Sequence, residues 1–198
     1  MKLYITPGSP YARMARIVVL EKGLGDRVEI IVAKTRTVDS PYYRVNPSGR
    51  VPYLMRDDGV GLEESTLICA YLNQLDGRPL FEPPSWEALR LEALARSMTD
   101  GVAVWGRELA RAQDERSPTV IQHEAERSRR MAALWEQEIA HPLMRGPLNM
   151  AQLTLACGLG MEARNRHLDW RRGHPRLCAW FAEFGKRPSF AATAPPSA

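Results

Sequence analysis

The chain has 198 residues, and its 44% hydrophobic content is enough to bury a sizeable core in one large domain or two small ones. The net charge is +4, but the basic residues are interleaved with Glu and Asp, so we expect no nucleic-acid partner. No run reaches the roughly 18 apolar residues of a membrane span, and the chain does not start with a charged-then-apolar signal. We therefore expect a cytoplasmic protein that does not associate with membranes.

The N-terminal part alternates strand and helix patterns. Residues 2–6 predict a strand, and the turn after it ends in Ser9, which can cap a helix, and Pro10, which suits the first helical position. Apolar residues at helical spacing predict that this helix covers 11–22. The β-branched run 28–33 is typical of a buried strand.

The next stretch contains a proline loop and a hairpin. The loop 46–52 reads Asn-Pro-Ser-Gly-Arg-Val-Pro and leads into a predicted hairpin over 51–63, with a tight turn at 57–59. Ser65 then opens an apolar helix that ends near the Asp-Gly-Arg-Pro sequence 76–79. The order strand, helix, strand, proline turn, hairpin, helix predicts a small α/β domain.

A change of composition marks a domain boundary. Three prolines fall within 77–84, and no strand pattern follows them. We therefore expect an α/β domain over 1–76, a linker over 77–84 and an all-helical domain over 85–198.

The second domain has four clear helical signals. Long helical periodicity covers 86–112 and 118–140, and a further apolar and aromatic helix covers 177–184 before a proline-containing tail. Asn149 followed three residues later by Gln152 predicts a capping box, in which each side chain bonds the backbone of the other residue.

Cysteine and histidine are too scattered to suggest a metal site. The cysteines lie far apart among apolar neighbours and are expected to be reduced, structural thiols: Cys69, Cys157 and Cys178. The four histidines lie in charged or proline-flanked segments and lack the spacing of metal ligands. The sequence predicts no metal.

The Val51-Pro52 pair is the first candidate for chemistry. Proline inside an expected strand is unusual, because it cannot donate to a neighbouring strand. The pair fits a surface edge strand, or alternatively a cis peptide bond. If the bond is cis, the N–H and C=O of Val51 face outward and can bond an extended peptide ligand as an added strand would.

The Glu63-Glu64-Ser65 sequence is the second candidate, because it lies at a predicted helix N-terminus. Backbone N–H groups there favour a carboxylate, the Ser65 hydroxyl adds a donor, and Glu64 can accept from an ammonium group. The three groups together fit the end group of an α-amino acid. An ordinary N-cap with acidic residues in the first turn has the same sequence pattern.

The two candidates in combination are more specific than either one. The Asn-Pro-x-Gly-x-Val-Pro loop, followed by Glu64-Ser65 and an apolar helix, resembles the glutathione transferase superfamily. Segments 149–161 and 170–193 resemble the helical domain of bacterial members, so the resemblance covers the whole chain. It implies an N-terminal thioredoxin-like domain, an all-α C-terminal domain and a homodimer with the active site near its interface.

The resemblance also implies glutathione as cosubstrate. In such proteins Val51 would pair with the cysteinyl backbone of glutathione, and Glu64 and Ser65 would hold its γ-glutamyl group. Arg50 and Lys34 would lie near a carboxylate of the ligand. The implied substrate-binding residues are Lys34, Arg50, Val51, Pro52, Glu64 and Ser65.

Ser9 is the best placed group to ionise the bound thiol. A thiol of pKa about 8.5 is about 3% ionised at pH 7, and lowering its pKa by two units requires about 2.7 kcal/mol, which one hydroxyl at a helix start could nearly supply. Ser9 and Tyr11 are the catalytic candidates, although Ser9 could be a plain N-cap and Tyr11 could pack under the loop. Arg13 could raise the local positive potential, or be a solvated charge.

Ser9-Pro10-Tyr11 resembles the Cys-Pro-Phe/Tyr start of glutaredoxins and cysteine-type transferases, with serine in place of cysteine. Because serine cannot form a mixed disulfide with glutathione, thiol–disulfide reduction is disfavoured. We predict a serine-type glutathione S-transferase-like enzyme whose thiolate attacks a hydrophobic electrophile. The electrophile would lie between the domains, near Met98, Val102 and Trp105, unless these residues only pack the core.

Two other functions are compatible with the same sequence features. A noncatalytic relative would use the same fold to bind a protein or an apolar ligand. Alternatively, the same glutathione site would serve isomerisation, dehalogenation or peroxide reduction.

Overall fold

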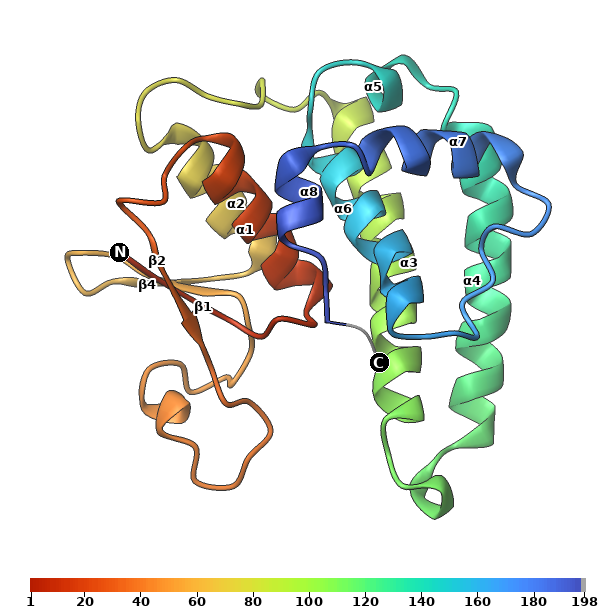
Figure 1. The fold of residues 1–198 in the computed structure, drawn as a ribbon, viewed down its shortest axis with the longest axis horizontal. Helices are drawn as coiled ribbons and strands as arrows, with labels where there is room; N and C mark the ends of the chain where they lie inside the picture. Colours follow the sequence, from red (N-terminus) through yellow and green to blue (C-terminus); the bar gives the residue numbers. More distant parts are fainter. Residues whose placement is uncertain (197–198) are drawn as a thin grey trace. The chain divides into compact units, whose positions relative to one another are not determined.

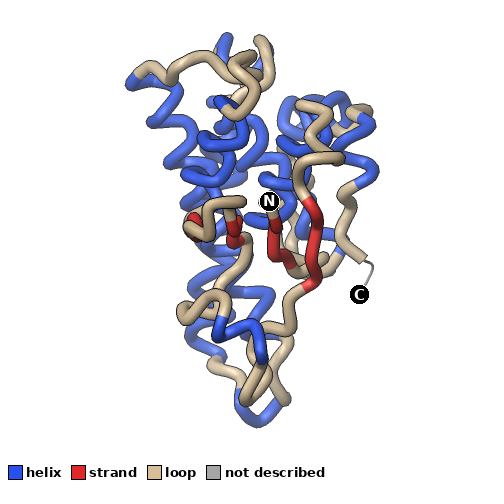
Figure 2. The backbone as a smooth tube through the Cα atoms, turned by 90° about the vertical axis from the view of Figure 1, so that its left-hand side faces the viewer, coloured by secondary structure: helices blue, strands red, loops and turns tan. Residues whose placement is uncertain are grey.

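The computed structural model describes residues 1–196, and the chain divides into two compact units, one over Met1–Leu80 and one that begins at Phe81. The division falls inside the proline-rich segment 77–84. Strands occur in the first unit, whereas the described part of the second unit is helical (Figure 2). The fold class is therefore the predicted one.

The first unit is a four-stranded sheet with two α-helices (Figure 1). Its main elements are β1 (Lys2–Ile5), α1 (Pro10–Glu21), β2 (Glu29–Val32), β3 (Tyr53–Met55), β4 (Gly61–Glu63) and α2 (Ser65–Gln74). The strand order is β2-β1-β3-β4, with β2 parallel to β1 and the other neighbouring strands antiparallel. α1 and α2 pack against each other. This is the predicted thioredoxin-like arrangement.

The start of α1 follows from its sequence. The Oγ of Ser9 accepts a hydrogen bond from the backbone N–H of Ala12 at 3.2 Å, and Pro10 takes the first helical position. The N-cap prediction for Ser9 is confirmed. Met14, Ile17 and Val18 lie on the buried side of the helix and are fully covered. This packing fixes α1, and with it the position of Ser9, in the first unit.

The strand predicted over 28–33 forms, but the prediction that it is buried is wrong. The strand is the shorter β2, and it lies at the edge of the sheet, paired only with β1. Ile30 is 42% exposed and Val32 is 63% exposed, whereas the flanking Val28 and Ala33 are buried. A β-branched run suits any pleated strand, so the sequence could not tell an edge position from a central one.

The predicted hairpin is confirmed. β3 and β4 pair antiparallel, and the turn between them contains Gly59 at a φ of 80°, which glycine adopts readily. The carboxylate of Asp58 accepts from the N–H of Val60 at 3.1 Å and closes the turn. The hairpin therefore sets the register of the two strands that flank the site.

A buried lysine holds the end of the first unit. The Nζ of Lys22 donates to the carbonyl oxygens of Asn73 at 2.9 Å and Arg78 at 2.6 Å, and to the carboxylate of Asp76 at 2.7 Å. The Lys22 side chain is only 3% exposed. The hydrogen bond from Lys22 holds the pKa of the Asp76 carboxyl below the ordinary value of an aspartate. α1 is thereby tied to the segment that follows α2.

The second unit is built from six α-helices in its described part. They are α3 (Trp86–Leu109), α4 (Pro118–Glu138), α5 (Pro142–Arg145), α6 (Met150–Leu159), α7 (Pro175–Phe184) and α8 (Pro188–Ala192). α3 packs against α4 and α6, and every residue of α6 after Met150 is buried. The short α5 and α8 were not predicted, and α8 falls in the expected tail. Within residues 1–196, no helix has the length and apolar character needed to cross a membrane.

The capping box forms only in half. The Oδ1 of Asn149 accepts from the N–H of Gln152 at 3.1 Å, as predicted. The side chain of Gln152 turns elsewhere, because its Nε2 donates to the carbonyl oxygens of Leu143, Gly146 and Pro147. Glutamine has an amide donor that a carboxylate lacks, so it ties the preceding loop instead of the N-cap backbone.

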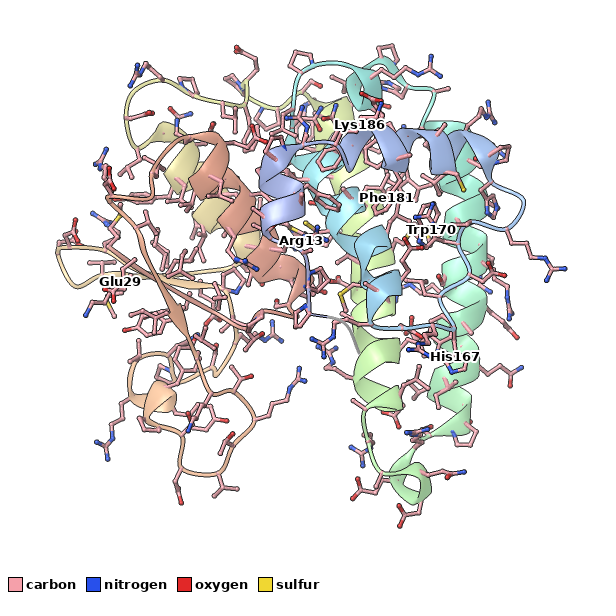
Figure 3. The ribbon with its side chains drawn as sticks, in the orientation of Figure 1. Arg13, Glu29, His167, Trp170, Phe181 and Lys186 are labelled. Carbon is pink, nitrogen blue, oxygen red and sulfur yellow. The ribbon has the colours of Figure 1, made fainter. Side chains whose placement is uncertain are left out.

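A carboxylate on α4 caps the start of α7. The carboxylate of Glu136 on α4 accepts from the backbone N–H groups of Arg176 at 3.1 Å and Leu177 at 2.9 Å. Burial opposes the ionisation of Glu136, but these bonds outweigh it and lower its pKa. The α7 residue Phe181 then meets Trp170 edge-on, with ring centroids 5.1 Å apart (Figure 3).

Candidate functional site

The sheet topology places the candidate residues of the first unit beyond the same end of the strands. Tyr53 at the start of β3 pairs with Glu63 at the end of β4, so the Val51-Pro52 and Glu64-Ser65 pairs both lie just beyond this end of the hairpin. Tyr53 also pairs with Tyr4, near the end of β1.

The other two candidate segments follow β1 and β2. The two strands are parallel and end together at Ile5 and Val32. Ser9 comes after β1 and Lys34 comes after β2. Both therefore lie beyond the end of the sheet that also carries Val51-Pro52 and Glu64-Ser65.

The peptide bond between Val51 and Pro52 is cis. β3 begins only at Tyr53, so Val51 lies outside the sheet, and its side chain is partly exposed. Within residues 1–196, the N–H and C=O of Val51 have no hydrogen-bonding partner. They form one free donor and one free acceptor, which is what an extended peptide ligand requires.

Glu64 and Ser65 begin α2 in an unusual backbone conformation. Glu64 is the N-cap residue, with φ 81° and ψ 125°, and its side chain makes no capping hydrogen bond. A non-glycine residue at such a φ costs about 1–3 kcal/mol, and such strain concentrates at functional sites. Ser65, the first helical residue, is 2% exposed, while Glu64 is exposed. The ordinary N-cap interpretation does not account for the strain.

Ser9 combines capping with a free donor. Its Oγ uses a lone pair to accept from the N–H of Ala12, and its O–H has no acceptor within residues 1–196. A hydroxyl can do both at once, because it has one donor and two acceptor positions. Tyr11 lies in the first turn of the same helix and is partly exposed.

Three other sequence-predicted residues differ in exposure. Lys34 and Arg50 are exposed, as ligand-recruiting charges would be. Arg13 on α1, labelled in Figure 3, is 4% exposed, so the prediction of a solvated charge is wrong. Its position one helical turn after Ser9 places a buried positive charge in the same part of α1.

A hydrogen-bonded network supports the loop before Val51. The hydroxyl of Tyr42 donates to the carbonyl oxygen of Arg50 at 2.5 Å, and the Nδ2 of Asn46 donates to the same oxygen at 3.1 Å. Burial raises the pKa of Tyr42 to about 12, so it remains a donor at neutral pH. Sequence reasoning missed Tyr42, and noticed Asn46 only as part of the loop motif.

The apolar candidates Met98, Val102 and Trp105 belong to the core of the second unit. All three are at most 5% exposed and lie in one cluster of buried residues. Core packing is therefore their role in this unit. No cluster of three or more histidine, cysteine or acidic side chains suited to a metal ion occurs in the part of the chain that is described.

The chain is similar to known proteins both in its first unit and over its whole length. Residues 3–80 match the family model of the glutathione S-transferase N-terminal domain. The chain is 28% identical to the uncharacterized GST-like protein YibF of Escherichia coli K12, over the full length of both chains.

Solved structures extend the likeness to the whole chain. A glutathione transferase family member from Pseudomonas fluorescens Pf-5, with bound S-(propanoic acid)-glutathione, is 34% identical at a TM-score of 0.86, covering 99% of this chain and 100% of that one. A glutathione S-transferase from Methylobacillus flagellatus with glutathione bound is 30% identical at a TM-score of 0.85, covering 98% and 99%. The chain therefore belongs to the glutathione transferase family.

Proposed function

We propose that this protein is a serine-type glutathione S-transferase that ionises the thiol of glutathione and directs it at a hydrophobic electrophile. The observation that carries the proposal is that Val51, Glu64-Ser65 and Ser9 all lie beyond the same end of the strands. In this arrangement the free peptide groups of Val51 pair with the cysteinyl residue. Glu64 and Ser65 take the γ-glutamyl group, and the O–H of Ser9 donates to the sulfur.

The exposed charges complete the recognition of glutathione. Lys34 and Arg50 are cations that follow β2 and precede Val51, respectively, and a carboxylate of the tripeptide is their natural partner. Tyr11 is the alternative donor to the sulfur. We place the protein in the cytoplasm as a homodimer, and we expect a detoxification role.

Thioether formation is the reaction that the site favours. The thiolate sulfur attacks an electrophilic carbon, a C–S bond forms, and the electron pair passes to a leaving group or to a conjugated acceptor that is then protonated. The related Pseudomonas fluorescens protein holds a glutathione thioether, S-(propanoic acid)-glutathione, which supports this reaction class. Ser9 cannot exchange disulfides, which argues against reductive chemistry by the protein itself.

Calorimetric titration with glutathione tests the proposed site. Ser65→Ala removes the side-chain donor at the start of α2 and is expected to weaken glutathione binding about tenfold, the effect of one hydrogen bond to a charged group. Ser128→Ala, which truncates another buried serine on α4, is the matched control and should bind like the wild type. A wild-type protein that does not bind glutathione would favour the noncatalytic alternative.

A further inference from the structure

The orientation of one peptide group decides whether Val51 can bind a ligand. The carbonyl of Arg50 and the N–H of Val51 belong to the same peptide group, and in a trans peptide these two bonds point in opposite directions. The Arg50 carbonyl is held by two donors, Tyr42 and Asn46. The bonds that fix this carbonyl therefore also aim the N–H of Val51, and they polarise it as a donor.

Asn46 in turn is oriented by Glu63. The Nδ2 of Asn46 donates to the Oε2 of Glu63 at 2.8 Å, in addition to its bond to Arg50. The Oδ1 of Asn46 accepts from the N–H of Ser48 at 3.1 Å, so both ends of the amide are assigned. Asn46 is 3% exposed, and a buried amide with all these partners has one orientation.

Glu63 also joins the loop to the other half of the site. Its Oε2 accepts a second hydrogen bond, from the hydroxyl of Ser48 at 2.5 Å. Glu63 ends β4 and directly precedes Glu64, the strained N-cap of α2. One carboxylate thus connects the loop that carries Val51 with the helix start that carries Ser65.

We propose that Glu63 is a positioning residue for glutathione. It acts through Asn46 to orient the N–H of Val51 and to fix the position of that N–H relative to Glu64-Ser65. This inference rests on the proposed function, because it concerns the same ligand. Glu63 itself does not touch the ligand. Its hydrogen bonds go to the side chains of Asn46 and Ser48.

The test is Glu63→Gln, which keeps the shape of the side chain and removes its charge. We expect the dissociation constant for glutathione, measured by calorimetry, to rise about tenfold. The reason is that the substitution removes the charge from the hydrogen bonds that Glu63 accepts from Asn46 and Ser48, and charge-assisted hydrogen bonds are the stronger kind. The thiolate absorbance per bound glutathione at saturation should stay as in the wild type, because Ser9 is untouched. Asp58→Asn, a carboxylate of the same hairpin that pairs with Arg56, is the matched control and should bind normally.

A double-mutant comparison separates positioning from general stability. If Glu63 acts through Asn46, then Glu63→Gln should add little to the loss of affinity caused by Asn46→Ala, and the two effects should not sum. Additive losses, or an equal loss in Asp58→Asn, would overturn the inference.

The wild type separates the inference from the proposed function. If the wild type binds glutathione and Glu63→Gln binds equally well, the inference alone is overturned. If the wild type does not bind, the proposed function fails, and the inference fails with it.

Discussion

Replacing Ser9 by alanine is expected to raise the pKa of the thiol of bound glutathione by about 1 to 2 units. A hydrogen bond to a charged group contributes about 1.5–3 kcal/mol, and each pKa unit corresponds to about 1.4 kcal/mol. From a bound-thiol pKa of about 6.5, two units below the free value, the thiolate fraction at pH 7 should fall about threefold for a rise of 1 unit and about 25-fold for a rise of 2 units, while binding stays within a few-fold because the peptide contacts remain. Thiolate absorbance of bound glutathione, followed against pH, measures the change.

The control for Ser9→Ala must account for the lost helix cap. Ser9 caps α1, so the variant should also lose about 0.5–2 kcal/mol of stability. Ser85 caps α3 with the same 3.2 Å bond, so Ser85→Ala loses a matched cap and should leave the thiolate unchanged. An unchanged thiol pKa in Ser9→Ala, with a raised one in Tyr11→Phe, would transfer the role to Tyr11.

Replacing Glu64 by glycine is expected to separate stability from binding. Glycine adopts a φ of 81° without the penalty of about 1–3 kcal/mol, less about 0.5–1 kcal/mol for its greater freedom when unfolded, so the variant should be slightly more stable. The lost carboxylate should weaken glutathione binding about tenfold or more. Thermal unfolding and calorimetry measure the two effects.

Two further variants assign these effects for Glu64. Glu64→Gln keeps the strained backbone and removes the charge, so it should lose affinity without gaining stability. Asp39→Gly relieves another positive φ, of 57°, and should bind like the wild type. Wild-type affinity in Glu64→Gly would show that this carboxylate does not hold the γ-glutamyl group.

Local sequence patterns predicted the parts of the site that depend on neighbours in the chain. The cap at Ser9, the hairpin turn at Gly59 and the start of α2 at Ser65 each follow from a few adjacent residues. The resemblance of the loop and the Glu-Ser pair then indicated what these elements hold. The family is the part of this prediction that the comparisons show.

Contacts between distant residues could not be predicted in this way. Asn46 and Glu63 are separated by a strand and a turn, and nothing in either residue type indicates that they meet. Likewise, the burial of Arg13 and the exposure of Val32 depend on which elements pack beside them. Gln152 shows that even a matching local motif can be redirected by a better tertiary partner.

A crystal structure of the protein with bound glutathione would show every proposed contact at once. We expect the cysteinyl backbone to pair with both peptide groups of Val51, the γ-glutamyl group to lie at Glu64 and Ser65, and the sulfur to lie within hydrogen-bonding distance of the Ser9 hydroxyl. Glutathione bound elsewhere, or bound here with its backbone away from Val51, would contradict it.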